Sequence, residues 1–193
     1  TSVLTLLLTH ANPEIQSQAA IALGRINDPE SVVALISALQ GAQNPQVMAG
    51  IVAALEEFGT RPAVEATLRL LQNPALPPDL RKGILSRLAA ECGKPGVWSE
   101  TLAAGAPLGI VDMRALAEIA PSAPPGSAPG LVALAQRYLA GGGEPQGRLS
   151  AGQILLAFAD RPEIQQFLLG LLSQDASGIA PAVAEIFRRN NDQ

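Results

Sequence analysis

Residue types that carry out catalysis are scarce in this chain. His10 and Cys92 are the only residues of their kinds. A cysteine nucleophile needs a histidine within hydrogen-bond distance, and about three predicted helical repeats separate these two positions. We therefore expect Cys92 to be a small buried apolar side chain, and His10 to lie at a helix C-terminus, where a cation suits the helix dipole.

Metal and phosphate sites also lack their usual patterns. A metal site needs a cluster of His, Cys and carboxylate residues at i, i+4 or CxxC spacing, and the sequence contains no such cluster. Glu56 and Glu57 are adjacent, so on a helix they point about 100° apart and cannot form an acid–base pair. The glycine-rich segment 141–147 lacks the Lys-Ser/Thr of a phosphate loop. The sequence predicts a chain that is not an enzyme and holds no metal or cofactor.

Composition restricts the kinds of partner. The 193 residues include 13 Lys and Arg and 17 Asp and Glu, for a net charge of −4. Nucleic acids and anionic membranes attract basic surfaces, so we expect neither as a partner. No apolar run reaches the roughly 18 residues of a membrane span. The sequence begins at Thr1 without a signal-peptide pattern, so we expect a cytoplasmic protein, with further sequence preceding Thr1.

The helices that must position any site follow a repeat. Pro29, Pro62, Pro95, Pro129 and Pro162 stand 33 or 34 residues apart, and each precedes an apolar stretch. A second proline series lies half a repeat away, at residues 13, 45 and 78. Proline suits the first helical turn, and apolar residues at i, i+4 and i+8 form one helical stripe. The predicted helices are 2–9, 13–25, 30–40, 45–58, 62–72, 78–92, 95–104, 110–120, 129–140, 148–159, 162–173 and 179–189.

These helices predict an all-α fold, a right-handed superhelix in one continuous array over residues 1–193. Few aromatic residues, 3% of the chain, are available, so closely spaced helices packed through Ala, Leu, Ile and Val are expected. Loops are expected at 121–130 and 141–147, which are rich in Gly and Pro. The array consists of a partial repeat at 1–10, helix pairs at 11–41, 44–73, 77–105, 110–141 and 147–174, and a terminal helix at 178–193.

Three segments of the first repeat carry a family resemblance. They are Asn12-Pro13-Glu14, then residues 19–26 (AAIALGRI), then residues 28–36 (DPESVVALI). This pattern resembles a HEAT repeat, and more closely the short bacterial type associated with phycobilisome lyases. The motif-level match covers about residues 10–72. The resemblance implies an α-solenoid scaffold, armadillo-like in architecture, and it does not imply lyase activity because fold does not fix function.

Trp98 and a row of cations are the candidate partner contacts. The repeat equivalents of Trp98 face outward, so Trp98 is either an exposed binding anchor or an inward-folded filler of a weak repeat. Arg61, Lys94 and Arg161 each precede the proline of a second helix, and stacking would align them along one rim. The alternative is that each of these cations pairs with a nearby acid.

The second helix of each pair is expected to line the concave face of the array. Small and polar residues predominate at the expected outward positions there: Ser31, Ala34, Ser37, Glu65, Arg69, Gln72, Gln136, Arg137, Gln165, Gln166 and Ser173. Such a surface suits a peptide or helix. We therefore expect a non-enzymatic scaffold module that binds a protein partner, with Arg69 and Gln165 among the contacts.

The sequence also allows two other functions and one further interface. The phycobilisome-type resemblance implies a linear tetrapyrrole as an alternative ligand, with Trp98 for stacking and Arg69 for a propionate. A HEAT-fold DNA glycosylase is a weaker alternative because the groove lacks a basic lining. The stripe Val3, Leu4, Leu6, Leu7 and Leu8 predicts an exposed apolar edge for self-association or a preceding repeat.

Overall fold

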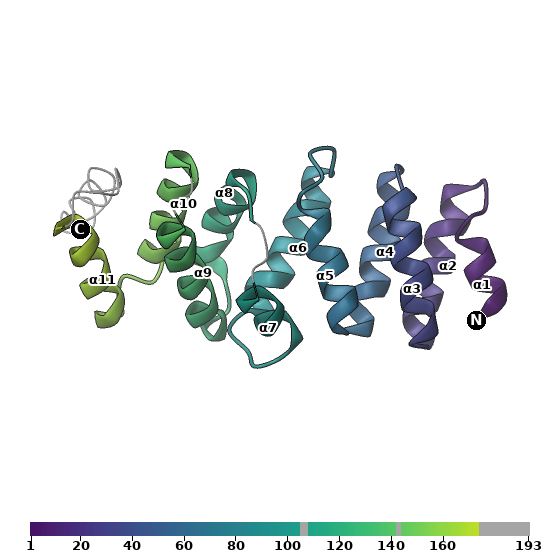
Figure 1. Cartoon of the computed structure of the whole chain (residues 1–193), viewed down its shortest axis with the longest axis horizontal. Coiled ribbons are helices and arrows are strands. Elements are labelled where there is room, and N and C mark those ends of the chain that lie inside the picture. The colour runs from purple at the N-terminus through teal and green to yellow at the C-terminus, as the bar shows by residue number, and fades with distance from the viewer. Residues whose placement is uncertain (105–107, 142–143, 174–193) are drawn as a thin grey trace. The chain divides into compact units, whose positions relative to one another are not determined.

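The computed structural model describes residues 1–104, 108–141 and 144–173, and every regular element in these ranges is helical (Figure 1). The first six helices are α1 (Ser2–Leu7), α2 (Pro13–Ile26), α3 (Glu30–Gly41), α4 (Pro45–Phe58), α5 (Arg61–Leu70) and α6 (Pro78–Glu91). The next five are α7 (Val97–Ala103), α8 (Ile110–Ile119), α9 (Ala128–Ala140), α10 (Pro145–Leu156) and α11 (Pro162–Ser173). The predicted all-α fold is confirmed, whereas the helix predicted at 179–189 lies outside the described residues.

Proline and asparagine start the first helices of the repeats as predicted. The Asn12 side chain accepts a hydrogen bond from the backbone N–H of Glu14 at 2.8 Å, and Pro13 opens α2. Asn44 accepts the N–H of Gln46 at 2.9 Å, and Pro45 opens α4. These caps satisfy backbone N–H groups that have no partner inside the helix. The predicted ends of α4 match the structure, while α10 begins three residues earlier than predicted.

The long loop predicted at 121–130 is wrong. Two short 3₁₀ turns, η1 (Ala120–Ser122) and η2 (Pro125–Ser127), occupy this segment, and α9 already begins at Ala128. Ala128 is fully buried, and the backbone of Gly126 lies against Gly93, where neither residue has a side chain to separate them. Close packing of glycine backbones therefore folds a segment whose composition indicated a loop. The second predicted loop, 141–147, is shorter than expected because α10 starts at Pro145.

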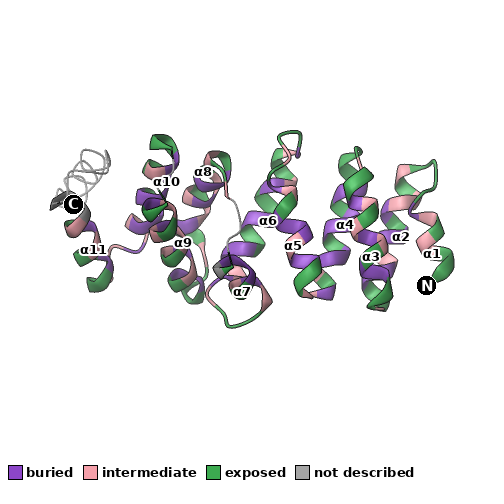
Figure 2. Cartoon of the chain, viewed as in Figure 1, coloured by how far each residue is buried: buried purple, intermediate pink, exposed green. Residues whose placement is uncertain are grey.

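The described residues divide into two compact units, with the division inside α6. Unit 1 contains Thr1–Ile84 together with residues 103 and 104, and unit 2 contains Leu85–Leu102 and the described residues from Leu108 onward. Both units bury aliphatic side chains on the inward side of each helix and expose polar ones (Figure 2). The single continuous array over 1–193 stays a prediction.

Unit 1 is built on a close contact between α2 and α4. A Cβ added at Gly24 would lie 2.7 Å from the Cα of Ala54, and one added at Gly50 would lie 2.5 Å from the Oγ of Ser17. Only glycine permits this approach, which brings the two helix backbones together. Helices α3 and α5 approach each other less closely than α2 and α4 do. The layer of second helices is therefore the more open layer of unit 1.

Unit 2 packs α8 and α9 against α10. Its fully buried side chains include Met113, Leu116, Leu131, Ile154 and Leu155. Small residues again set the helix spacing, because Gly130 lies against the backbone of Cys92 and Gly147 lies against the Tyr138 ring. Aliphatic cores with glycine contacts thus replace the aromatic packing that the composition lacks.

Candidate functional site

A cavity of about 260 Å³ lies between α3 and α5 in unit 1. Its α3 side is formed by Ile36, Leu39 and Gln40, followed by Ala42. Its α5 side is formed by Ala66, Arg69 and Leu70, followed by Asn73. Ala66 contributes no side chain beyond Cβ, so the space between the two helices is left unfilled. We call this space the α3–α5 cavity.

A neighbouring cavity of about 560 Å³ lies on the other side of α3. We call it the α1–α3 cavity, and its lining shares Ala42 with the α3–α5 cavity. None of the described residues that line it is charged. They are Thr5, Leu8, Thr9, Gln16, Ala34, Ser37, Ala38, Gly41, Ala42, Gln43, Asn44 and Val47.

The two cavities occupy equivalent places in successive repeats. Ala34 and Ser37 line the first, and the residues 32 positions later, Ala66 and Arg69, line the second. The same step relates Ala38 to Leu70 and Gly41 to Asn73, and a step of 31 relates Thr5, Leu8 and Thr9 to Ile36, Leu39 and Gln40. The repeat thus places a cavity at both junctions among α1, α3 and α5, and the side chains give each cavity its own chemistry.

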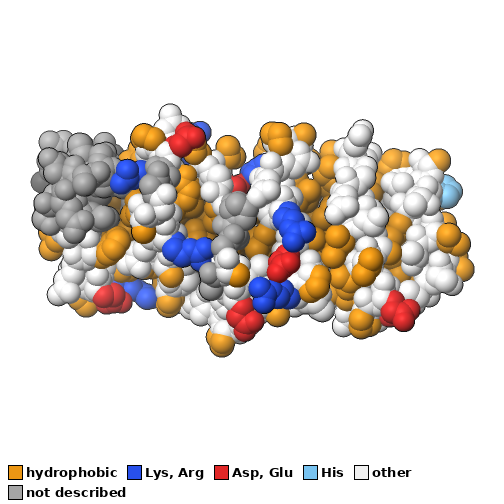
Figure 3. Space-filling view, in the orientation of Figure 1, with side chains coloured by type: hydrophobic (Ala, Val, Ile, Leu, Met, Phe, Trp, Pro, Cys, Tyr) orange, Lys and Arg blue, Asp and Glu red, His pale blue; other side chains and the backbone are white. Residues whose placement is uncertain are grey.

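Charge distinguishes the α3–α5 cavity. The Nε of Arg61 donates to Oε1 of Glu65 at 3.0 Å, and Nη2 of Arg69 lies 3.5 Å from Oε2 of the same carboxylate. The Arg61 and Arg69 side chains are 59% and 70% exposed. One acid therefore stands between two cations, and the local sum is positive. Figure 3 shows these signs alternating along α5, with hydrophobic surface between this row and α3.

The concave face predicted on the second helices stays a prediction. In unit 1 the first helices α2 and α4 are the closer pair, whereas α3 and α5 leave a cavity between them. One residue predicted to face outward on the second-helix layer is wrong, because Ser31 is buried, at 1% exposed.

Trp98 is not an exposed anchor. Its side chain is buried, at 7% exposed, within unit 2. Helix α7 is short, and its neighbouring inward position carries only Thr101, whose hydroxyl finds no hydrogen-bond partner among the described residues. A large indole fills the space that such small side chains leave. The structure thus supports the alternative in which Trp98 folds inward, and it offers no ring surface to a partner.

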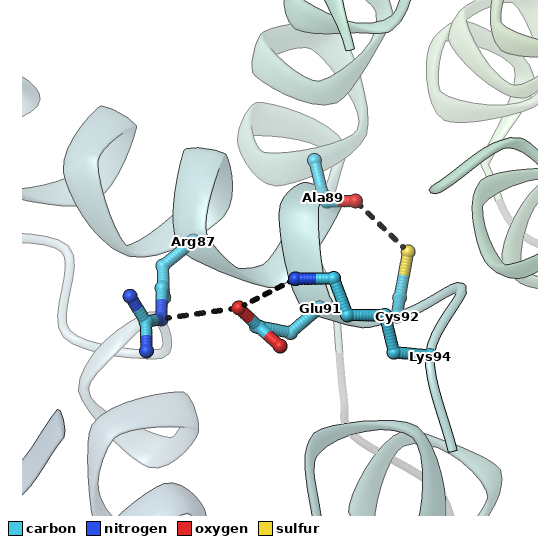
Figure 4. A network of polar contacts seen from close by, with 5 residues as sticks. All are labelled: Arg87, Ala89, Glu91, Cys92 and Lys94. Atoms are coloured by element: carbon cyan, nitrogen blue, oxygen red, sulfur yellow. Dashed lines mark hydrogen bonds and ion pairs between the residues drawn. The ribbon is translucent and has the colours of Figure 1, made fainter. Parts of the chain in front are cut away.

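The other predicted contacts in unit 2 have local partners. Lys94 Nζ lies 3.1 Å from Oε1 of Glu91, which also receives Arg87 Nε at 3.8 Å (Figure 4). The Arg161 guanidinium lies 5.9 Å from the centre of the Phe158 ring, a cation–π distance. Gln165 donates its side-chain amide to the carbonyl of Ala159 at 2.7 Å, although it is exposed. Local pairing, the alternative to a partner-binding rim, is confirmed for Arg61 and Lys94.

Arg81 is a buried cation on α6. Lys82 and Arg87 of the same helix are exposed, whereas Arg81 is only 9% exposed. Its guanidinium donates to the carbonyl of Leu71 at 2.7 Å and to that of Asn73 at 2.8 Å. These carbonyls follow the end of α5, where helix carbonyls lack partners within the helix. Arg81 thus fixes the end of the helix that forms one wall of the α3–α5 cavity.

Cys92 is buried, whereas His10 lies on the surface. Cys92 is 7% exposed, and its Sγ donates to the carbonyl of Ala89 at 3.4 Å (Figure 4). Burial raises the pKa of the thiol to about 11, partly opposed by a backbone hydrogen bond and aided by the charge of Glu91. A thiol with this pKa supplies little thiolate nucleophile at neutral pH. His10 is exposed, and its Nδ1 accepts the backbone N–H of Asn12 at 3.0 Å.

The apolar edge predicted at α1 is confirmed in part. Val3 and Leu6 are 67% and 73% exposed, whereas Leu8 is buried and helps to line the α1–α3 cavity. Within the described ranges, no group of three His, Cys, Asp or Glu side chains is placed to hold a metal ion. No helix in the same ranges has the length and hydropathy to cross a bilayer.

Sequence reasoning found Arg69 and missed the cavity beside it. Ile36 and Leu39 are apolar residues at helical spacing, which is typical of a buried stripe, and Ala66 is too small to indicate a site by itself. A signal was available, because an Ala beside larger apolar residues on facing helices leaves space unless something else fills it. The alignment of Ala34 with Ala66 repeats this signal.

Comparison with known families supports the repeat. The family model described as HEAT repeats matches residues 1–89. This range contains α1 to α5, both cavities and most of α6. No curated protein sequence matches the chain. The closer resemblance to phycobilisome-lyase repeats is not tested by these comparisons and stays a prediction.

Proposed function

We propose that this chain, which carries HEAT repeats over residues 1–89, is a non-enzymatic module that binds a protein partner on the second-helix face of unit 1. HEAT repeats commonly mediate protein interaction, which agrees with this proposal. A partner can bind this face because its side chains are exposed and the space between its helices is unfilled. A cytoplasmic location belongs to the same proposal.

The observation that carries the proposal is the pair of equivalent cavities on α1, α3 and α5. They adjoin each other at Ala42, so one extended segment can contact both. Side chains along them combine apolar floors with exposed amides and hydroxyls, such as those of Gln40 and Ser37. Peptide-binding grooves use this combination, in which apolar pockets give affinity and polar groups bind the backbone.

A photo-crosslinking experiment tests the proposal. A photoreactive amino acid is placed at Gln40, which is exposed on α3, and in a matched variant at Ala53, which is exposed on α4 in the other layer. After irradiation in a native lysate, we expect a discrete protein adduct from position 40 and none from position 53. An excess of unlabelled chain should suppress the adduct. Equal adducts from both positions, or none from either, would contradict the assignment of this face.

The tetrapyrrole alternative keeps a simple test. Its sequence argument offered Trp98 for stacking, and the buried indole no longer supplies that contact, while Arg69 remains exposed. Addition of a linear tetrapyrrole to the purified chain, followed by a visible absorption scan, decides it. A spectral shift that is lost in Arg69→Gln would favour a bilin ligand over a protein partner, and an unchanged spectrum would end this alternative.

A further inference from the structure

We propose that the α3–α5 cavity binds a peptide segment in which one apolar side chain lies within about two residues of an Asp or Glu. This inference rests on the proposed function and names the chemistry of the partner. The apolar side chain enters the cavity between α3 and α5. The carboxylate meets the guanidinium of Arg69 at the edge of the same cavity.

The size of the cavity sets the size of the inserted group. At about 260 Å³, it is smaller than the roughly 300–1,000 Å³ of typical small-molecule pockets. It has room for one large side chain. Ile36, Leu39, Ala66 and Leu70 supply aliphatic surface, so burial of an apolar group is favourable there.

The charges at the edge of the cavity favour a negatively charged group beside the inserted side chain of the peptide. Glu65 lies 3.0 Å from Arg61 and 3.5 Å from Arg69, so a single carboxylate serves two guanidiniums. Arg69 is the more weakly held of the two, and its side chain is 70% exposed. A second carboxylate, supplied by the partner, completes the pairing of the two cations and can bind Arg69 through two parallel hydrogen bonds.

The spacing between the two groups follows from chain geometry. Arg69 itself lines the cavity, so the carboxylate lies close to the inserted side chain. An extended peptide advances about 3.3 Å per residue, and the flexible arginine stem spans the remaining distance. The acid is therefore adjacent to the apolar residue or one position further. Gln40, exposed on the opposite wall, is placed to bind the peptide backbone with its amide.

Other anionic partners fit this surface less well. Nucleic acids and lipid headgroups bind through rows of cations, and this face presents two arginines around one glutamate. Over the whole chain, acids outnumber Lys and Arg by 17 to 13, so a polyanion meets general repulsion. A single carboxylate beside an apolar group takes advantage of the local positive charge without this penalty.

A random heptapeptide phage library, selected on the intact chain, tests the proposal. We expect the selected peptides to share an apolar residue with Asp or Glu within two positions. The leading peptide is then synthesised with a fluorescent label, together with a version in which Asn or Gln replaces its acid. Fluorescence anisotropy should show about fivefold weaker binding of the amide version, and the difference should shrink at high salt.

Variants of the chain locate the two contacts. Arg69→Gln should weaken the acidic peptide about fivefold and leave the amide version unchanged. Ala66→Leu fills the cavity and should weaken both peptides about tenfold or more, while thermal unfolding shows that the chain stays folded. Arg87→Gln is the matched control, because Arg87 also pairs with a glutamate four residues later but lies in unit 2. It should change neither affinity.

The outcomes separate this proposal from the proposed function. Peptides that depend on Ala66 but show no preference for acid would overturn the carboxylate contact and keep the peptide-binding face. Peptides that ignore both Ala66 and Arg69 would overturn the cavity as the site. Selection of basic peptides, or of none, would overturn the inference, and crosslinking at position 40 would still decide whether a protein partner uses this face.

Discussion

The two cavities of unit 1 occupy the same place in successive repeats but differ in volume and charge. The α1–α3 cavity measures about 560 Å³ and has an uncharged lining, whereas the α3–α5 cavity measures about 260 Å³ and carries Arg69. At the position of Arg69, the earlier repeat has Ser37, and at the position of Glu65 it has Val33. The earlier cavity therefore lacks both the cation and its acid.

This difference indicates that the repeat determines where a cavity lies, whereas individual side chains determine what the cavity can bind. The repeat fixes where a cavity opens, because glycine contacts hold α2 and α4 together while α3 approaches α1 and α5 less closely. A few positions then decide what each cavity accepts. In repeat proteins, stability comes from each repeat and its contacts with neighbours, so the outward residues are free to differ.

The largest expected effect comes from the end of α5. Arg81→Ala removes the guanidinium that binds the carbonyls of Leu71 and Asn73, and leaves these groups without their charged donor. We expect a loss of about 3 kcal/mol in the free energy of unfolding, measured by urea titration followed by circular dichroism. It should also weaken peptide binding at the α3–α5 cavity.

A neighbouring cation provides the control for that change. Lys82 is exposed on the same helix, so Lys82→Ala should change the free energy of unfolding by less than about 0.5 kcal/mol. If the two alanine variants unfold at the same urea concentration, Arg81 does not support the wall of the cavity.

The next prediction tests the close contact between α2 and α4, which leaves both cavities open in the layer of second helices. Gly24→Ala places a Cβ 2.7 Å from the Cα of Ala54, so the backbones of α2 and α4 must move apart. We expect a loss of about 2 kcal/mol by urea titration. Gly83→Ala is the matched control, since Gly83 is exposed in α6 with no atom within 4 Å of its added Cβ. That variant should gain up to about 1 kcal/mol from helix propensity.

A smaller effect is expected when the arginine is moved from the α3–α5 cavity to the α1–α3 cavity. Arg69→Ser should weaken the acidic peptide about fivefold at the α3–α5 cavity. Ser37→Arg, made in that background, should restore affinity for the acid over its amide version, now at the α1–α3 cavity. Anisotropy titrations of both peptides against both variants measure this. If the double variant shows no preference for the acid, the two cavities are not equivalent in binding.

The last effect concerns pH and lies outside both cavities. Burial raises the pKa of Cys92 from 9.0 to about 11, so the folded chain holds this proton more tightly than the unfolded chain. Its contribution to stability is fully present below pH 9 and is lost as the pH rises from 9 to about 11. Urea titrations at pH 8 and pH 10.5 should show a larger decline for the natural chain than for Cys92→Ala.

Peptide binding should stay unchanged in the Cys92→Ala variant, because none of the residues that line either cavity lies near Cys92 in the sequence. An equal decline in both chains between the two pH values would show that the thiol does not carry this pH dependence.

The sequence by itself determined the helices and their order. Prolines at helix starts, asparagine caps and the apolar stripe are local signals that depend on neighbours within a few residues. These signals predicted both ends of α4 correctly. They also predicted the repeat of unit 1, which the HEAT-repeat match over residues 1–89 supports. The two candidate cations of α5, Arg61 and Arg69, also came from the sequence, since exposed charges follow from helix position.

Only the tertiary structure decided which side chains are buried and where space remains. The helical position of Trp98 allowed either exposure or burial, and the small side chains around it leave space that the indole fills. The carbonyls of Leu71 and Asn73 beyond the end of α5 hold Arg81 inside. The α3–α5 cavity depends on the distance between two helices, which glycines in a different pair of helices set. Such spacing depends on contacts far apart in the chain, and no local pattern of residues contains it.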